Sequence, residues 1–244
     1  RRACSVNLNR CVQYAVNHGK DYKEYLANVI DLCHKVQLAY NENLKDLQRH
    51  GMLPLFDAGY ININRQYLTI GINGLVEAAE FMGLNITPND DYLHFVQGIL
   101  SLVEKFNKQY RSKEVMFNCE MIPAENVGVK HAKWDREDGY FVPRDCYNSY
   151  FYVVEDDSLS IIDKFKLHGA PYIEHLTGGS ALHMNLEEHL SKEIGRARLN
   201  SSHTVISYAV FCLKKKKNTQ THQPREQKRS YKHTSLKQMT NLLN

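Results

Sequence analysis

Two stretches in which a β-strand turns sharply into an α-helix set the strongest limit on how this chain folds. One is predicted at Val115–Asn126 and the other at Thr177–Lys192, and in both of them polar residues stand where the strand ends. Parallel α/β sheets place their chemistry beyond the carboxyl ends of their strands. We therefore predict an α/β fold whose functional site is carried by the region Arg111–Glu193.

Two long amphipathic helices are predicted ahead of this region. The first runs from Asp21 to Arg49, because apolar residues recur there every three or four positions, and Gly51 follows as a stop. The second is predicted to start at Thr87, which we interpret as its N-cap, with Pro88 in the first turn. Long helices of this kind are stable only when their apolar stripe docks on a larger core.

Shorter elements follow from the same periodicities. Alternation predicts a strand at Ser5–Val12, and helical spacing begins at Leu75 after an irregular stretch. Ser158–Leu167 is predicted to be a helix, and Asp135–Arg144 is predicted to be a polar loop.

The composition is typical of a globular protein with one large domain or two small ones. Of the 244 residues, 43% are apolar and 24% are charged, so a sizeable core is expected. The sequence has no apolar run of roughly 18 residues and no signal-peptide core at its start, so we expect no membrane span and a cytoplasmic location. It does not begin with Met, and we expect it to be a piece of a longer protein.

Six cysteines lie at positions 4, 11, 33, 119, 146 and 212, without the spacing of a metal site. We predict reduced thiols and no metal site in this chain. Cys4, Cys11, Cys33 and Cys146 are interpreted as structural, with a second redox-active thiol at Cys4 or Cys11 as the alternative.

The net charge of +4 is unevenly distributed along the chain. Residues 194–244 contain 11 Lys or Arg and one Glu, which leaves 20 basic and 26 acidic residues in 1–193. The first part therefore carries −6 and the second +10. An acidic body disfavours nucleic-acid binding by residues 1–193.

Residues 194–244 resemble the translation of a ligated DNA-sequencing adapter more than a natural basic tail. Ile206–Leu213 is what ATC TCG TAT GCC GTC TTC TGC TTG encodes, and Leu199–His203 fits CTG AAC TCC AGT CAC. A run of A gives Lys214–Lys217, and A-rich codons give the Lys, Asn, Thr and Gln that follow. We predict that 194–244 is a non-native, disordered read-through tail, and that 1–193 is the native domain.

Five long sequence motifs lie within residues 1–193. They are FDAGY at 56–60, RQYLTIGINGLVEAAEF at 65–81, FNCEMIPAEN at 117–126, KWDREDGYFVPRDCYNSYFY at 133–152 and LTGGSALHMNLEEHLSKE at 176–193. With these motifs, essentially all of residues 1–193 resembles the catalytic subunit of anaerobic (class III) ribonucleoside-triphosphate reductase, a glycyl-radical enzyme.

The resemblance implies a ten-stranded α/β barrel, of which residues 1–193 form an incomplete part. It implies reduction of ribonucleoside triphosphates to 2′-deoxyribonucleotides for DNA synthesis. A thiyl radical on a loop cysteine, made from a glycyl radical, removes the ribose 3′ hydrogen, and the 2′ hydroxyl then leaves. It further implies an S-adenosylmethionine iron–sulfur activase, ATP and dNTP effectors, a homodimer and a four-cysteine structural zinc site.

The same resemblance places several of these features outside the native part. The allosteric region and the cysteine loop are expected upstream of Arg1, and the radical glycine and zinc cysteines downstream of Glu193. We therefore predict that the chain is inactive alone. Formate and a thiol redoxin both stay open as the reductant.

Catalytic candidates lie on the first predicted strand. Asn118 and Glu120 share one face, where they are expected to hydrogen-bond the ribose hydroxyls, with the carboxyl group protonating the leaving 2′ oxygen. The alternative is a Glu paired with a structural Arg. Cys119 is grouped with them as a catalytic candidate, although alternation places it on the opposite face, where a packed core thiol is expected.

Substrate-binding candidates lie at the two strand-to-helix turns. Pro123, Ala124, Glu125 and Asn126 suit a triphosphate held by backbone N–H groups at a helix start. Gly178, Gly179 and Ser180 form either a phosphate or base-approach loop or a plain tight turn. His183 is either a ligand contact or a core histidine with its hydrogen bonds satisfied.

Two other functions stay open from the sequence. One is a different glycyl-radical enzyme. An ATP-binding region upstream of Arg1 would favour the reductase over this alternative. The other is a basic-tailed nucleotide or nucleic-acid binding module, whose binding would have to survive deletion of residues 194–244.

Overall fold

The computed structural model describes residues 2–121, 125–185 and 208–212, all within the compact unit Arg1–Lys214. Its elements are, in order, β1 (Arg2–Asn7), α1 (Leu8–Asn17), α2 (Tyr22–Arg49), α3 (Pro54–Asp57), the 3-10 helix η1 (Ile63–Arg65), β2 (Tyr67–Asn73), α4 (Leu75–Phe81), α5 (Asp90–Tyr110), β3 (Met116–Met121), α6 (Glu125–Glu137), α7 (Ile161–Leu167), α8 (Ala170–Ile173), β4 (Gly179–Asn185) and β5 (Tyr208–Cys212).

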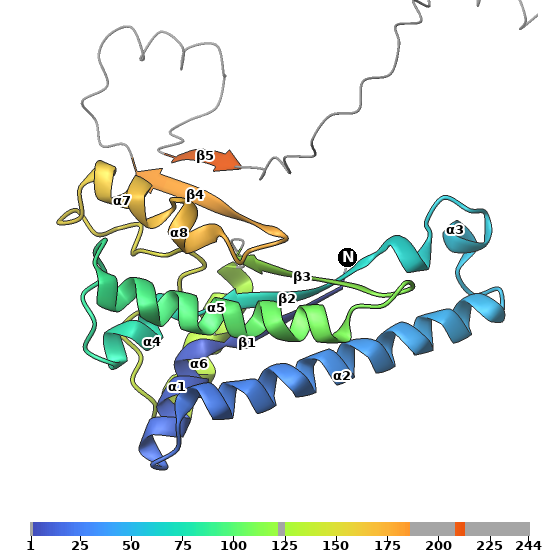
Figure 1. Ribbon diagram of the computed structural model, residues 1–244, viewed down its shortest axis with the longest axis horizontal. Helices are drawn as coiled ribbons and strands as arrows, with labels where there is room; N and C mark the ends of the chain where they lie inside the picture. Colours follow the sequence, from blue (N-terminus) through green and yellow to red (C-terminus); the bar gives the residue numbers. More distant parts are fainter. Residues whose placement is uncertain (1, 122–124, 186–207, 213–244) are drawn as a thin grey trace, which may run out of the picture. The chain divides into compact units, whose positions relative to one another are not determined.

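The strands form one sheet in the order β1-β2-β3-β4-β5 (Figure 1). Strands β1 to β4 are parallel to their neighbours, and β5 pairs antiparallel with β4. The order does not reverse at a switch point as it does in a doubly wound sheet, and it is the order in which a barrel adds its strands. The predicted α/β class is confirmed.

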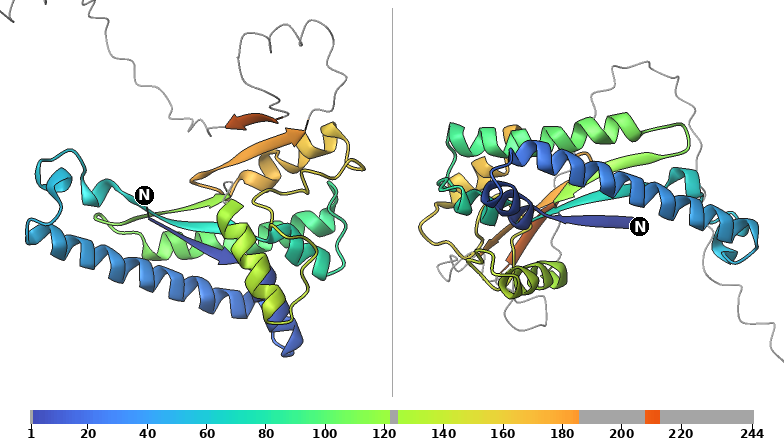
Figure 2. Two further views of the ribbon diagram at one scale, coloured as in Figure 1. Left: turned by 180° about the vertical axis from the view of Figure 1, so that it is seen from behind. Right: turned by 90° about the horizontal axis from the view of Figure 1, so that it is seen from below.

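The two faces of the sheet differ in chemistry. Helices α2 and α5 run along one face (Figure 2), where strand residues such as Ile70 and Cys119 join the apolar core. The opposite face carries small and polar residues. In the register of the strands, Ser5 is beside Gly71 and Gly71 is beside Glu120 on this face. The helix-covered face of the sheet is therefore apolar, and the other face is polar.

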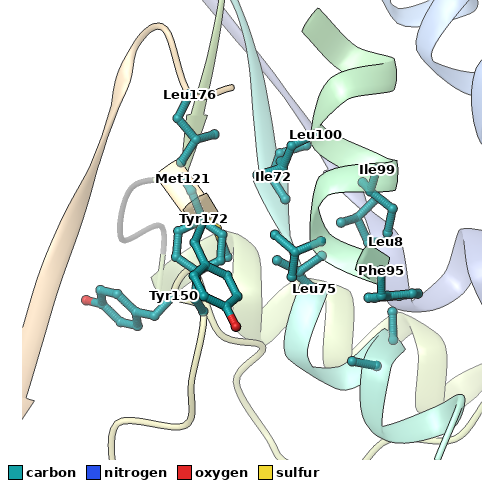
Figure 3. Packing of buried hydrophobic residues seen from close by; sticks show 14 of the residues in the cluster. Leu8, Ile72, Leu75, Phe95, Ile99, Leu100, Met121, Tyr150, Tyr172 and Leu176 are labelled. Atoms are coloured by element: carbon teal, nitrogen blue, oxygen red, sulfur yellow. The ribbon is translucent and has the colours of Figure 1, made fainter. Parts of the chain in front are cut away.

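The core joins elements that are distant in the sequence (Figure 3). Leu8, Ile72, Leu75, Ile99 and Leu100 meet there from α1, β2, α4 and α5, and all are 3% exposed or less. Burying one such side chain contributes roughly 1.5–3 kcal/mol. This packing fixes the helices against the sheet and so sets where each strand ends.

The strand predicted at Ser5–Val12 is wrong beyond Asn7, where α1 begins. The Asn7 side chain caps this helix by accepting a hydrogen bond from the Arg10 N–H at 3.1 Å. Helical spacing then buries Leu8, Cys11, Val12 and Ala15 on one side. An N-cap and a 3.6-residue stripe therefore override the short alternation.

Strand β2 was missed by the sequence analysis, although it lies between β1 and β3 in the sheet. Its signal is the alternation of Leu68, Ile70 and Ile72 with Thr69, Gly71 and Asn73. The helix predicted from Leu75 is confirmed as α4, and Gly74 before it has a left-handed φ of 77°. This is a conformation that glycine adopts at little cost.

Both long helices are confirmed, with corrections to their details. The docked side of α2 includes His34, Gln37 and Asn41, while Val36 and Tyr40 of the predicted stripe are 55% and 49% exposed. The buried polar groups are tolerated because they are bonded: His34 meets Asn107 at 2.9 Å, for example.

The N-cap of α5 is Asn89 and not Thr87. The Asn89 side chain accepts a hydrogen bond from the Tyr92 N–H at 2.9 Å. It also donates to the Thr87 hydroxyl at 2.8 Å, so Thr87 supports the cap without being it. Both side chains favour helix starts, and only the local geometry chooses between them.

The loop predicted at Asp135–Arg144 starts three residues too early, because α6 continues to Glu137. Asp135 is fully buried, and its carboxylate is satisfied by other elements. The helix predicted at Ser158–Leu167 is present as α7 and starts at Ile161, where Ser160 is the N-cap.

Five residues of the predicted tail, Tyr208–Cys212, form β5 on the edge of β4. The division into a native domain at 1–193 and a disordered tail at 194–244 stays a prediction. Main-chain hydrogen bonds to an open sheet edge need no particular side chain, so the pairing does not depend on the origin of the segment. The remaining residues from 186 on, including the helix predicted at Leu186–Lys192, lie outside the described part of the chain.

Candidate functional site

The site begins with two polar side chains on β3. Asn118 and Glu120 lie on the sheet face opposite α2 and α5, and they are only 4% and 6% exposed. The Asn118 Nδ2 donates a hydrogen bond to Glu120 Oε1 at 2.9 Å. The structure therefore places the two predicted residues side by side and out of bulk water.

The second turn meets this pair directly. The Gly178 N–H donates to the Cys119 carbonyl at 2.8 Å, and the Cys119 N–H donates to the Thr177 hydroxyl at 3.2 Å. A Cβ added to Gly178 would stand 2.1 Å from Glu120 Cγ and 2.6 Å from Asn118 Nδ2. Only glycine fits here, and its backbone lies against the carboxamide and carboxylate groups.

A third polar side chain belongs to the same face and was missed by the sequence analysis. Thr69 on β2 is the register partner of Asn118 and is 1% exposed. In the described part of the chain, the Thr69 Oγ1 and Asn118 Oδ1 atoms are buried without a hydrogen-bond partner. A buried polar atom without a partner is costly, and a bound hydroxyl or amine would satisfy both atoms.

Cys119 lies on the other side of the sheet from this site. Its side chain is fully buried in the apolar core, and burial, reinforced by the charge of Glu104, raises the pKa of the thiol to about 12. The geometry thus agrees with a packed core thiol. It separates Cys119 from the face of Asn118 and Glu120.

The triphosphate candidates can be placed only in part. Pro123 and Ala124 lie outside the described residues, and α6 starts at Glu125. Asn126 is exposed in the first turn of α6. Anion binding at this helix start stays a prediction.

Ser180 and His183 are held by neighbouring segments. The His183 Nδ1 lies 2.9 Å from the Tyr150 hydroxyl, and the Tyr152 hydroxyl donates to the His183 carbonyl at 2.6 Å. The Ser180 hydroxyl is 3.3 Å from His168 Nε2. Gly179 is the register partner of Glu120, so the turn lies beside the catalytic candidates on the neighbouring strand.

A buried polar cluster around Asp135 joins α6 to the carboxyl end of β1. The Asp135 carboxylate accepts hydrogen bonds from Asn7 at 2.9 Å, Arg10 at 2.6 Å and Tyr147 at 2.8 Å. Burial and this carboxylate raise the pKa of Tyr147, so the phenol stays a donor. The role of Asp135 is to position these elements, and its spacing in the sequence gave no signal of that.

A second cluster holds residues 144–149 to the end of β2. The Glu77 carboxylate is fully buried, meets Arg144 Nη1 at 2.6 Å and accepts from the Asn148 N–H at 3.0 Å. Burial raises the pKa of Glu77 although Arg144 opposes the shift. The Asn73 side chain donates to the Tyr147 carbonyl at 3.1 Å, which ties the same segment to β2.

No group of three or more metal-ligating side chains occurs among the described residues. None of the helices in that part of the chain is both long enough and apolar enough to cross a bilayer.

Comparison with known proteins decides what the chain is related to. A family profile described as "Anaerobic ribonucleoside-triphosphate reductase" matches residues 2–216. The chain belongs to this family. The match continues past residue 193, so it includes part of the segment that we interpret as adapter-derived, and the origin of that segment stays a prediction.

Solved structures of the anaerobic ribonucleotide reductase from Thermotoga maritima are similar to the chain. The form with dATP bound in the specificity site is 26% identical, with a TM-score of 0.69, over 86% of this chain and 36% of that chain. The complex with dATP and CTP is 25% identical, with a TM-score of 0.65, over 72% and 30%. The chain therefore spans about a third of the length of these proteins. None of the curated proteins compared with it matches.

Proposed function

We propose that this reductase-family chain carries part of the active site of an enzyme that reduces ribonucleoside triphosphates to 2′-deoxyribonucleotides. The buried Asn118–Glu120 pair under Gly178 is the observation that supports this most strongly. It lies near the carboxyl end of β3, a parallel strand, and α/β barrels place their active sites at the carboxyl ends of their strands. A similar solved structure, that of the Thermotoga maritima enzyme, contains dATP and CTP, which supports a nucleotide as the ligand.

Each residue at the site has a proposed part. Glu120 supplies a proton to the 2′ oxygen as it leaves, and Asn118 holds the carboxyl group in place through its 2.9 Å hydrogen bond. Thr69 Oγ1 and Asn118 Oδ1 accept ribose hydroxyl donors, since both atoms are buried without another partner in the described residues. Gly178 and Gly179 allow the sugar or base to approach the backbone.

Phosphate binding is proposed for the start of α6, where Pro123, Ala124, Glu125 and Asn126 follow β3. Free N–H groups at the first turn of a helix of this length bind anions. Gly178, Gly179 and Ser180 are proposed as a second contact for the phosphates or the base, and His183, which lies 2.9 Å from the Tyr150 hydroxyl, as a further ligand contact.

The radical chemistry itself is expected from groups outside residues 1–193, together with the activase, the zinc site, the ATP and dNTP effector sites and the homodimer contacts. The chain's own residues bind the ribose, orient it and hold a proton. We therefore propose that the chain alone is inactive and that the complete enzyme works in the cytoplasm.

The test uses the full-length enzyme that contains this segment, expressed with its activase without oxygen. Glu120→Gln should lower kcat for deoxyribonucleotide formation by about 10²–10⁴-fold while KM changes little, because a general acid acts in the transition state. The matched control is Glu114→Gln, which changes an exposed carboxylate and should keep full activity. Unchanged kcat in Glu120→Gln would remove Glu120 from the chemistry.

A further inference from the structure

The structure holds a pair of thiols that the proposed reaction does not use. The Sγ atoms of Cys4 on β1 and Cys33 on α2 are 3.7 Å apart, although 29 residues separate them in the sequence. Both side chains are partly exposed. The pair lies on the helix-covered side of the sheet, where Val6 and Ile72 also point, and so away from Asn118 and Glu120.

The other described cysteines do not share this arrangement. Cys11 and Cys119 are buried, and burial raises the pKa of each thiol to about 12. Cys146 is partly exposed, and its sulfur lies 3.9 Å from the Tyr147 carbonyl. The Cys4 and Cys33 sulfur atoms are already in van der Waals contact at 3.7 Å, and a disulfide bond requires them to close to roughly 2 Å.

We propose that Cys4 and Cys33 form a redox-reactive pair, which closes a disulfide between β1 and α2 by exchange with a small-molecule disulfide such as oxidised glutathione.

The exchange balances in two steps. The Cys4 thiolate attacks one sulfur of the small disulfide, so a Cys4–glutathione bond forms, the original S–S bond breaks, and one glutathione thiolate leaves and takes up the Cys4 proton. Cys33 then attacks the Cys4 sulfur, and the second glutathione leaves with the Cys33 proton. Two protein thiols are oxidised, and one small disulfide is reduced to two thiols.

Cys4 is the sulfur that attacks first. A hydrogen bond with Cys33 lowers the pKa of Cys4 to about 7, although burial acts in the opposite direction. The same contact and burial raise the pKa of Cys33, so Cys33 stays a thiol beside the Cys4 thiolate and does not attack first. Once Cys4 is bonded to glutathione it carries no charge, the part of the shift that Cys4 causes is lost, and Cys33 can give up its proton as it attacks. The thiolate is the reactive form, so Cys4 should react with glutathione disulfide at least about tenfold faster than Cys11.

The test incubates the 244-residue chain with oxidised glutathione, blocks the remaining thiols by alkylation and maps tryptic peptides by mass spectrometry. Cys4, Cys11 and Cys33 fall in different tryptic peptides, residues 3–10, 11–20 and 24–35, so their pairing is read directly. The expected product links peptide 3–10 to peptide 24–35. Its yield should fall at least about tenfold when the chain is first unfolded in urea, because contact in the fold creates the pair.

Two variants separate the steps. Cys33→Ser should accumulate glutathione on Cys4, because no second thiol resolves the mixed disulfide. Cys11→Ser is the matched control and should form the same linked peptides as the unchanged chain. The proposal is overturned if the unchanged chain gives no link between 3–10 and 24–35, if Cys11 is the main partner, or if unfolding leaves the yield unchanged.

Discussion

At the scale of single residues, neighbours in the sequence have opposite environments because strand β3 alternates its side chains. Asn118 and Glu120 face the polar side of the sheet, while Cys119 between them is fully buried among apolar groups. A one-residue shift of register would exchange the two sets. The backbone bonds from Cys119 to Thr177 and Gly178 hold the turn that covers the polar pair.

Gly178→Ala should destabilise the chain by about 1–3 kcal/mol, since its new Cβ would overlap Glu120 Cγ. The measurement is urea unfolding followed by circular dichroism. In the Glu120→Ala background the same change should cost less, because the 2.1 Å overlap with Glu120 Cγ is gone and only the 2.6 Å approach to Asn118 Nδ2 remains. Equal costs in both backgrounds would show that the turn does not lie against Glu120.

At the scale of elements, helices α5 and α6 each contain a glycine in their interior, and their surroundings differ. A Cβ on Gly98 of α5 would meet only the flexible end of Lys23, at 3.2 Å. A Cβ on Gly128 of α6 would stand 2.7 Å from the Tyr147 carbonyl. Helix α6 can approach residues 146–148 only because position 128 has no side chain.

The two glycine-to-alanine substitutions should therefore change the free energy of unfolding in opposite directions. Gly98→Ala should stabilise by about 0.5–1 kcal/mol, because alanine is the better helix former and Lys23 can move. Gly128→Ala should destabilise by about 1–3 kcal/mol, because the Tyr147 backbone cannot move as easily. Urea midpoints of the two variants, measured side by side, give the comparison, and a gain in stability for Gly128→Ala would contradict the packing of α6.

At the scale of the whole molecule, buried titratable groups link stability to pH. Burial lowers the pKa of His131 and of His168 below the ordinary value of 6.5, so both rings are neutral in the fold. The unfolded chain binds protons more readily at these sites. Their contribution to stability is therefore fully present above pH 6.5 and is lost as the pH falls through 6.5 towards the lowered folded values.

Thermal unfolding should accordingly show a midpoint that falls as the pH is lowered from about 7 to about 5. His168→Gln should flatten this dependence, because one of the two neutral rings is removed. Comparison of the slopes for the chain and the variant checks the assignment. An unchanged slope would mean that His168 titrates alike in the folded and unfolded chain.

Much of the architecture was readable from the sequence, and the misses have specific causes. The two long helices and strand β3 have clear periods, so they were found, together with the face shared by Asn118 and Glu120. Strand β2 was missed although its alternation is visible, and Thr69 was lost with it. Asp135 was assigned to a loop because the stretch that it begins is polar and contains Gly139 and Pro143. In the fold it lies in α6, and three partners satisfy its buried carboxylate.

Periodicity and long motifs are local properties of the chain, so they were enough to predict the α/β class, the reductase family and the face of β3 that Asn118 and Glu120 share. Three contacts became visible only in the folded chain: Gly178 lies against Glu120, Thr69 is beside Asn118, and Cys4 meets Cys33. These neighbours come from different strands and helices. Strand register and side-chain packing bring them together, and both depend on several segments of the chain at once.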